Sequence, residues 1–146
     1  MRALTFLVIL FFATNIFAQN VNDEIIEIQT TEGSIIIQLD GRRAPITVSN
    51  FVKLIKAKYF DGTIFHRVIP NFMIQGGGFN QDLIDLEPVS SIPNESGNWG
   101  YAVFGNVIEG MSIADKISKK PTGPRGRFSQ DVPIENIEIM KIIILD

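Results

Sequence analysis

The sequence contains no cysteine and a single histidine, His66, and these absences exclude several kinds of active site. Without cysteine the chain forms no disulfide bond and offers no thiolate for a metal ion or for nucleophilic attack. With one histidine, a histidine-rich metal centre is excluded, and a hydrolytic triad would depend on that residue alone as its base. The acidic residues are scattered among turns, so the sequence predicts no metal site.

The chain also has no excess of positive charge. Its formal net charge at pH 7 is −3 over 146 residues, so nothing indicates binding to nucleic acid. Proline and glycine are not frequent enough to suggest disorder. A length of 146 residues with 45% hydrophobic residues suits one small globular domain.

The first 18 residues differ from the rest of the chain. Arg2 is followed by an apolar run over residues 3–13, a polar break, and a small residue at Ala18. This layout predicts a secretory signal peptide over residues 1–18, a mature domain over residues 19–146, and a periplasmic or secreted location. The alternatives are an uncleaved anchor or a buried helix. Because a spanning helix needs about 20 apolar residues, we expect no stable membrane insertion after cleavage.

Two patterns open the mature chain. Residues 25–39, IIEIQTTEGSIIIQL, alternate apolar and polar side chains around a glycine-bearing turn, which predicts a β-hairpin. Residues 44–60 change to helical spacing, and Pro45 suits the first turn of that helix. The residues predicted to share one helix face are Val48, Phe51, Val52 and Ile55.

The remaining pattern is mostly strand. We expect strands at 64–69, 72–75, 101–104 and 137–145, a second helix within 107–119, and a loop at 121–127. On the second helix, Met111, Ala114 and Ile117 are predicted to share a face. Many strands and two helices predict a mainly β fold, a barrel or curled sheet capped by helices.

The stretch FHRVIPNFMIQGGGF, residues 65–79, is the candidate site. Its triple glycine lacks the Lys and Ser/Thr of a phosphate loop, so we expect a tight strand end with positive φ. A lone strand histidine such as His66 is more often structural than catalytic. Residues 67, 69, 73 and 75 could line one surface, a groove with one guanidinium and one amide. A surface salt bridge of Arg67 is the alternative.

The same region resembles a known family. YFDGTIFHRVIPNFMIQGG, residues 59–77, is similar to the signature of the cyclophilin-type peptidyl-prolyl cis-trans isomerases, and residues 44–55 and 99–117 resemble segments around that family's helices. The resemblance implies a closed antiparallel barrel capped by two helices and isomerisation of X–Pro bonds without a cofactor. It also implies a monomer acting on proline-containing unfolded or exported polypeptides.

The resemblance also implies site roles. Arg67 matches the residue that donates a hydrogen bond to the prolyl nitrogen of the twisted amide. Phe72 and Met73 match residues that hold the proline ring, and Gln75 matches one that orients the substrate and the arginine. Two further matched positions lie near the site, Ile69 and His66.

The chain departs from the family at one place. Between the positions of Asn98 and Trp99 the family has a further segment of several dozen residues, which carries half of the proline pocket and interior strands of the barrel. We therefore expect an incomplete barrel. Two alternatives stay open: a catalytically impaired proline-peptide-binding or chaperone-like module, and a chain that does not fold stably.

Overall fold

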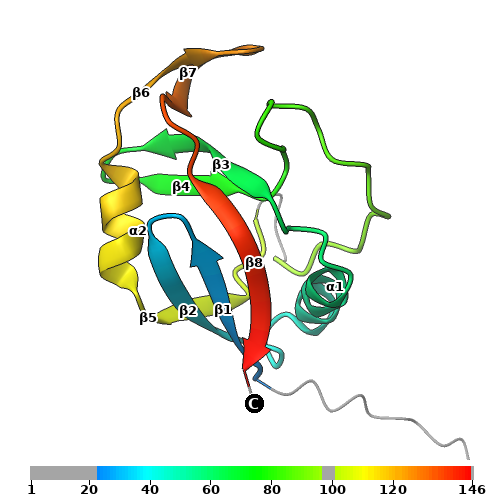
Figure 1. Cartoon of the computed structure of the whole chain (residues 1–146). Helices are drawn as coiled ribbons and strands as arrows, with labels where there is room; N and C mark the ends of the chain where they lie inside the picture. Colours follow the sequence, from blue (N-terminus) through cyan, green and yellow to red (C-terminus); the bar gives the residue numbers. More distant parts are fainter. Residues whose placement is uncertain (1–22, 97–100, 146) are drawn as a thin grey trace, which may run out of the picture.

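The computed structural model describes residues 23–96 and 101–145. In these residues the strands of the main sheet are β1 (Ile25–Thr30), β2 (Gly33–Leu39), β3 (Thr63–Ile69), β4 (Met73–Gly76), β5 (Gly105–Glu109) and β8 (Glu138–Leu145). They form one curled antiparallel sheet in the order β4-β3-β8-β1-β2-β5 (Figure 1). A separate hairpin and two helices complete the set: β6 (Thr122–Arg125), β7 (Phe128–Pro133), α1 (Pro45–Lys56) and α2 (Met111–Ser118).

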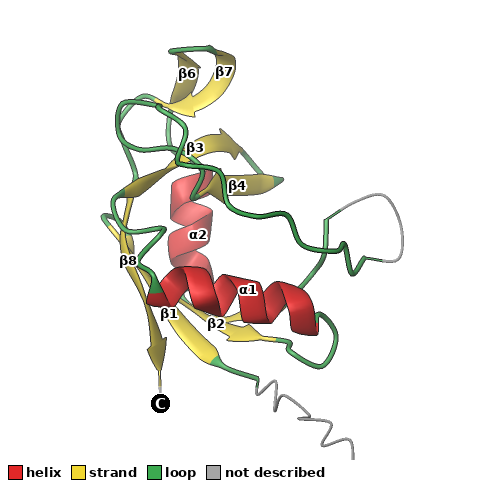
Figure 2. Ribbon diagram, turned by 90° about the vertical axis from the view of Figure 1, so that its right-hand side faces the viewer, coloured by secondary structure: helices red, strands yellow, loops and turns green. Residues whose placement is uncertain are grey.

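The two helices lie at opposite ends of the curled sheet, and their buried residues belong to one core cluster (Figures 1 and 2). The predicted apolar face of α1 is confirmed, because Val48, Val52 and Ile55 are its buried residues. In α2 the helical spacing is confirmed for Ile117, which is fully buried, whereas Met111 at the start of the helix is 54% exposed. Both helices thus cover core residues of the sheet with a narrow apolar stripe.

The first hairpin has the register that its alternation predicts. Ile26 lies opposite Ile37 and Ile28 lies opposite Ile35. Strand β8 pairs with the other edge of β1, so the last strand of the chain lies at the centre of the sheet beside the first. The residues below 2% exposure are mostly apolar and mark the core: Ile26, Leu39, Val48, Ile64, Val68, Ile117, Val132 and Ile137, with Thr63 and Pro133.

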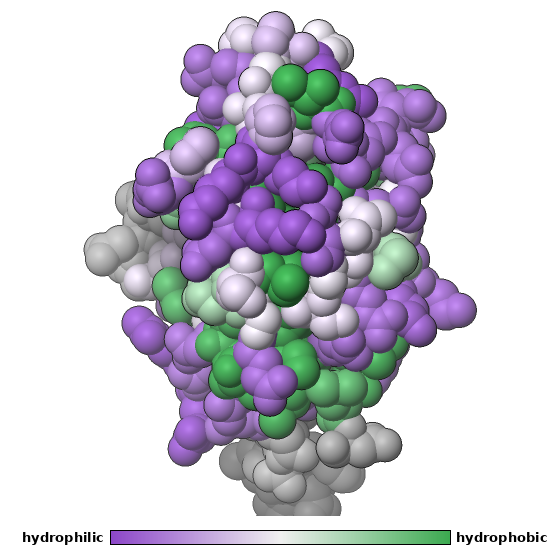
Figure 3. All heavy atoms as spheres, turned by 60° about the vertical axis from the view of Figure 1, so that its left-hand side comes forward, coloured by the Kyte–Doolittle hydropathy of each residue, from purple (hydrophilic) through white to green (hydrophobic). Residues whose placement is uncertain are grey.

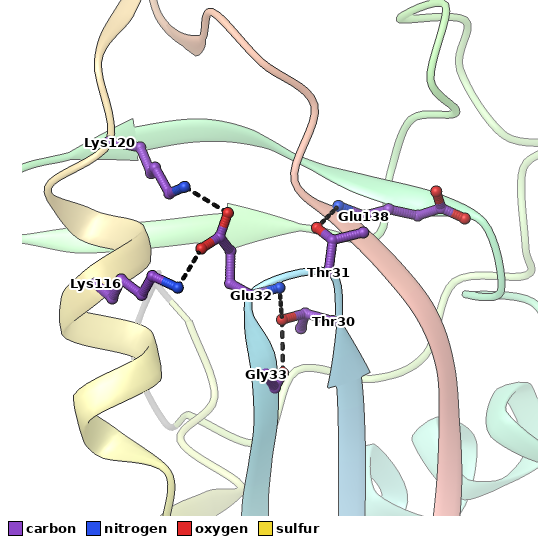
Figure 4. Close-up of polar contacts among 7 residues, drawn as sticks. All are labelled: Thr30, Thr31, Glu32, Gly33, Lys116, Lys120 and Glu138. Atoms are coloured by element: carbon purple, nitrogen blue, oxygen red, sulfur yellow. Dashed lines mark hydrogen bonds and ion pairs between the residues drawn. The ribbon is translucent and has the colours of Figure 1, made fainter.

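A polar cluster joins the β1–β2 turn to α2 (Figure 4). Glu32 in the turn forms ion pairs with Lys116, at 2.8 Å, and with Lys120. These two lysines hold the pKa of the Glu32 carboxyl below its ordinary value. The Thr30 hydroxyl donates to the Gly33 carbonyl across the same turn. The turn therefore sets where the last part of α2 lies against the sheet.

A carboxylate from the long loop caps α1. Ala44 at the start of α1 has no side chain that can cap, but Glu95 accepts hydrogen bonds from the backbone N–H groups of Ile46 (2.9 Å) and Thr47 (2.6 Å). Burial alone would raise the pKa of Glu95, and these donors outweigh it, so the pKa lies below its ordinary value. A negative charge at a helix N-terminus is favourable, so Glu95 fixes the irregular loop against α1.

Two predicted elements differ from the structure. Residues 101–104, predicted as a strand, have no regular secondary structure, and Tyr101 is 95% exposed. The strand there is β5, which begins at Gly105 and pairs with β2. The loop predicted at 121–127 contains β6, which pairs with β7. The sequence does not predict this strand because it contains Pro124, and proline donates no hydrogen bond and is tolerated only at sheet edges.

The main sheet is a half-barrel that does not close within the described residues. Strands β4 and β5 are its two edges, which agrees with the mainly β, incomplete barrel expected from the sequence. The predicted signal peptide and the Asn98–Trp99 junction lie outside the described residues. In the part of the chain that is described, no helix is both long enough and apolar enough to cross a membrane.

Candidate active site

Four of the predicted site residues share one face of the β3–β4 hairpin. The register pairs Arg67 with Gln75 and Ile69 with Met73. Directly paired residues of an antiparallel ladder point to the same side, as do residues two apart on one strand. The hairpin thus presents a guanidinium, an amide and two apolar side chains on one surface. This is the surface that the sequence predicts for residues 67, 69, 73 and 75.

A shift in register turns this face of the hairpin away from the core. Phe65 pairs with Gly76 and Arg67 pairs with Gln75, so His66 is an extra residue in β3. Regular alternation would put Phe65 and Arg67 on one side. With the extra residue, Phe65 belongs to the core cluster while Arg67 is the exposed position of the strand. Such irregularities in a ladder re-aim side chains, and here the irregularity directly precedes Arg67.

The triple glycine at the end of β4 includes the positive φ angle that the sequence predicts. Gly77 has φ +86°, in the left-handed region that favours glycine, and a Cβ added there would lie 3.1 Å from the ring of Phe60. The prediction of a tight strand end with positive φ is confirmed. The triple glycine therefore ends a strand beside the candidate site.

Phe72 lies apart from the other predicted residues. It follows Asn71, whose φ of +61° turns the chain between β3 and β4, and its side chain is 78% exposed. Met73, its neighbour, is partly buried. The structure brings Met73 into the shared face and leaves Phe72 projecting at the tip of the hairpin, where it could meet a ligand from one side.

Arg67 has a partner that the sequence did not predict. Its Nε lies 3.8 Å from Oδ2 of Asp131 in β7, and the two side chains are 47% and 22% exposed. The ion pair agrees with the alternative considered for Arg67, a salt bridge at the surface. No local pattern could have revealed it, because Asp131 lies far along the chain and is brought close by packing of β7 on β3.

His66 lies in an aromatic enclosure. It is 6% exposed, and its ring lies 4.5 Å from that of Phe79 and 5.9 Å from that of Phe128, measured between centroids. Burial lowers the pKa of His66 below its ordinary value, the Ile64 backbone opposes this, and the nearby charges of Arg67 and Arg127 add to it. Desolvation in this enclosure disfavours the charged imidazole.

The same enclosure attaches the β6–β7 hairpin to β3. Arg127 stacks over Phe79 with 4.8 Å between its guanidinium carbon and the ring centroid, and it pairs with Asp85 at 2.6 Å. A guanidinium over an aromatic face is attractive. The hairpin, seen at the top of Figure 1, is thus held where Asp131 can reach Arg67.

The chemistry available on this face is limited. It offers one cation, one amide and apolar side chains, without a nucleophile beside a base. Among the described residues no group of three or more histidine, cysteine or acidic side chains could hold a metal ion. A surface of this kind can bind a peptide and donate hydrogen bonds to it.

The curled half-barrel and its two helices are those of known structures. The fold is similar to a crystal structure of a Cryptosporidium parvum cyclophilin-type peptidyl-prolyl cis-trans isomerase, with a TM-score of 0.61 and 23% sequence identity, covering 84% of this chain and 98% of that one. At this identity the likeness establishes the fold class alone.

Sequence comparison establishes the family. The family model described as "Cyclophilin type peptidyl-prolyl cis-trans isomerase/CLD" matches residues 25–99 and 83–139. A peptidyl-prolyl cis-trans isomerase of Acinetobacter baylyi is 34% identical, with 88% of this chain and 89% of that protein covered. For peptidyl-prolyl cis-trans isomerase B of Escherichia coli the identity is 31%, with 79% and 96% covered. The chain belongs to the cyclophilin-type peptidyl-prolyl cis-trans isomerases, and it is an isomerase by family.

The comparisons also show that this chain lacks internal residues. The alignment with the Acinetobacter baylyi protein spans 169 residues, more than the 146 of the whole chain, so the relative has residues with no counterpart here. The family model matches in two overlapping stretches, of which the first ends at residue 99 and the second begins at residue 83. Both observations agree with a missing segment near the Asn98–Trp99 junction and with a sheet that stays open.

Proposed function

We propose that the chain isomerises X–Pro bonds of unfolded or exported polypeptides, with Arg67 stabilising the twisted amide. The observation that carries this proposal is the shared face of the β3–β4 hairpin. There a half-exposed guanidinium lies across the ladder from Gln75 and beside the apolar pair of Ile69 and Met73. This is the combination of groups that the reaction requires.

The reaction needs positioning more than bond chemistry. Rotation about an X–Pro bond crosses a barrier of about 18–20 kcal/mol and breaks no covalent bond. As the amide twists, conjugation is lost and the prolyl nitrogen recovers a lone pair that can accept a hydrogen bond. A donor aimed at that nitrogen stabilises the twisted state more than the planar one, which is what lowers the barrier. Arg67 supplies the donor.

The neighbouring side chains hold the substrate. In this proposal Met73, Ile69 and the exposed ring of Phe72 contact the proline ring, and the Gln75 amide orients the substrate backbone. His66 supports β3 from its aromatic enclosure without touching the peptide. The open sheet leaves the opposite side of the ring to solvent, so we expect slower turnover than in a closed pocket, since misplacement by about 1 Å can cost 10²-fold.

Replacing Arg67 tests the proposal. We expect Arg67→Ala to lower kcat/KM by about 10²- to 10³-fold, the effect of losing one preorganised donor. Arg67→Lys keeps the charge but loses the planar guanidinium, so it should restore little activity. Cis-to-trans conversion of a proline peptide is the measurement, on purified residues 19–146.

Arg42→Ala is the matched control. Arg42 is another exposed arginine in an ion pair, with Asp23 at 2.9 Å, and lies outside the hairpin. Its replacement should leave kcat/KM unchanged, and the melting temperatures of both alanine variants should stay near that of the parent. Equal activity of Arg67→Ala and the parent protein would contradict the proposed role of Arg67.

A binding module is the second candidate, and the exposure of Phe72 favours it. With 78% of that side chain exposed, the hairpin can contact a proline ring on one side while leaving the ring loosely held. Such a surface would bind proline peptides without turning them over. Peptide binding by the parent protein with no rate above the uncatalysed one would support the module and exclude the enzyme.

Export forms part of the proposal. The layout of residues 1–18 supports a signal peptide, and removal after Ala18 would leave the domain outside the cytoplasm. Mass spectrometry of the protein made in a bacterial host checks this. A periplasmic or secreted form that begins at Gln19 is the expected result, and a full-length cytoplasmic form would contradict it.

A further inference from the structure

We infer that Asp131 is a positioning residue for Arg67, holding the guanidinium in the orientation that the isomerisation uses. The inference rests on the proposed role of Arg67, and it adds a residue that neither the sequence nor the family comparisons indicated. Its basis is an ion pair between two elements that meet only in the folded chain: Nε of Arg67 in β3 and Oδ2 of Asp131 in β7, 3.8 Å apart.

The position of Asp131 is set by buried neighbours. Val132 and Pro133, which follow it in β7, are among the most buried residues of the described chain. The Pro133 carbonyl accepts a hydrogen bond of 3.0 Å from Nη1 of Arg125 in β6. A residue next to such an anchored pair has little freedom to move. Asp131 can therefore serve as a fixed point against which a flexible arginine is oriented.

The backbone of Asp131 lies in an uncommon region. Its φ is +67°, which costs most side chains energy but is tolerated by aspartate and asparagine. Conformations of this kind persist where the surrounding structure imposes them and are frequent at functional sites. Here the left-handed turn accompanies a carboxylate that faces Arg67 from β7.

The contact uses one nitrogen of Arg67 and leaves two. Asp131 approaches Nε at 3.8 Å, and within the described residues the Arg67 guanidinium donates no hydrogen bond. Arg67 pairs with Gln75 of β4 across the ladder, and its guanidinium faces Asp131 of β7. The carboxylate charge beside Nε favours one orientation of the planar group, with the terminal nitrogens directed toward a peptide lying on the hairpin.

The expected effect is modest, because the pair is partly exposed. Exposed ion pairs contribute up to about 1 kcal/mol, which corresponds to about a fivefold change in rate. An orienting contact acts on the reacting geometry and does not touch the peptide. Its loss should therefore lower kcat by about fivefold and leave KM nearly unchanged.

The first experiment measures turnover of a proline peptide by variants of the purified protein. Asp131→Asn keeps the size and tolerates positive φ, and it should lower kcat about fivefold with little change in KM or melting temperature. Asp131→Glu should recover part of kcat. On an Arg67→Ala background, Asp131→Asn should have no further effect. Asp23→Asn, which removes the carboxylate of another exposed ion pair, is the matched control and should behave as the parent.

The outcomes separate the two proposals. A large loss in Arg67→Ala with parent-like kcat in Asp131→Asn overturns the role of Asp131 and leaves that of Arg67 intact. Parent-like activity in Arg67→Ala overturns the proposed function. A loss in Asp131→Asn that appears equally on the Arg67→Ala background shows a structural effect and also overturns the inference.

A second experiment does not depend on turnover. The Nε–Hε signal of Arg67 in a nitrogen-15 NMR spectrum, assigned by its disappearance in Arg67→Lys, reports on the ion pair directly. We expect this signal to shift in Asp131→Asn, because a nearby charge is removed, and to stay in place in Asp23→Asn. An unchanged signal in Asp131→Asn would overturn the inference even in a protein without measurable turnover.

Discussion

Two neighbouring residues of β3, His66 and Arg67, show how one strand serves two purposes. His66 lies against Phe79 and Phe128 and is nearly inaccessible, whereas Arg67 is half exposed and faces Gln75 and Asp131. The histidine joins β3 to the β6–β7 hairpin, and the arginine meets the substrate in our proposal. The aromatic enclosure of one residue thus supports the position of the other.

Because His66 is the only histidine, its protonation can be followed through stability. The pKa of His66 is lowered in the folded protein by burial, so below pH 6.5 the unfolded chain takes up a proton that the folded protein resists. Stability should be full above about pH 6.5 and fall as the pH drops below it, by at most about 1.4 kcal/mol per pH unit for a single proton.

The variant His66→Phe removes this titration while keeping a ring among Phe79 and Phe128. We expect its stability to change less than that of the parent between about pH 7 and about pH 5, above the range where carboxylates protonate. Urea unfolding at several pH values is the measurement. Parallel pH profiles for parent and variant would show that the pKa of His66 is not lowered by folding.

At the scale of elements, the structure depends on the tight connection at Gly110 between β5 and α2, called here the β5–α2 joint. Gly110 precedes α2 with φ +79°, and a Cβ there would overlap the Ser34 carbonyl oxygen and lie 2.9 Å from Cα of Ile35. The helix can therefore start directly after the edge strand only if this residue has no side chain. The position of α2 against β2 depends on that glycine.

Gly110→Ala should destabilise the protein by about 2–4 kcal/mol, because it combines backbone strain with overlap against a strand. Gly123→Ala is the matched control, since Gly123 has no positive φ and a Cβ added there would meet no atom within 4 Å. It should change the free energy of unfolding by less than about 0.5 kcal/mol. Chemical denaturation compares the two, and equal effects would contradict this account of the β5–α2 joint.

At the scale of the whole molecule, the dominant feature is an antiparallel sheet with two free edges. Strands β4 and β5 end the sheet within the described residues, and free edges offer unpaired backbone groups to other chains. Figure 3 shows the face that carries β5 and α2, where hydrophobic side chains gather below a hydrophilic band. Exposed apolar residues near this edge include Val103, Ile108 and Met111.

A charge on the edge strand should reduce self-association. Ile108 in β5 is 47% exposed, and Met140 in the central strand β8 is 48% exposed, so the two differ in strand position and hardly in exposure. Ile108→Lys should slow the growth of light scattering several-fold on warming, whereas Met140→Lys should change it little, because edge pairing is what the lysine blocks. Equal effects of both variants would show that association does not proceed through β5.

The sequence predicts the features of this protein that depend on residues close together in the chain, and it does not predict those that depend on residues far apart. The hairpin of residues 25–39, the helix at Pro45 and the shared face of residues 67, 69, 73 and 75 are periodic patterns, so the sequence predicts them. Strands β6 and β7 carry no such pattern, because a proline interrupts β6 and three consecutive polar residues interrupt β7. The sequence predicts a strand at 101–104, whereas β5 begins at Gly105, because pairing with β2 decides where the strand begins.

The sequence by itself determined the family, the mainly β fold and the hairpin that carries Arg67, because signature, alternation and turn residues are local properties of the chain. Only the tertiary structure decided the partner of Arg67 and the enclosure of His66. Asp131 and Phe128 come from β7, whose sequence gives no indication that it contacts β3. They reach β3 because burial of Val132 and its neighbours draws the β6–β7 hairpin onto the sheet, and such packing depends on the whole chain.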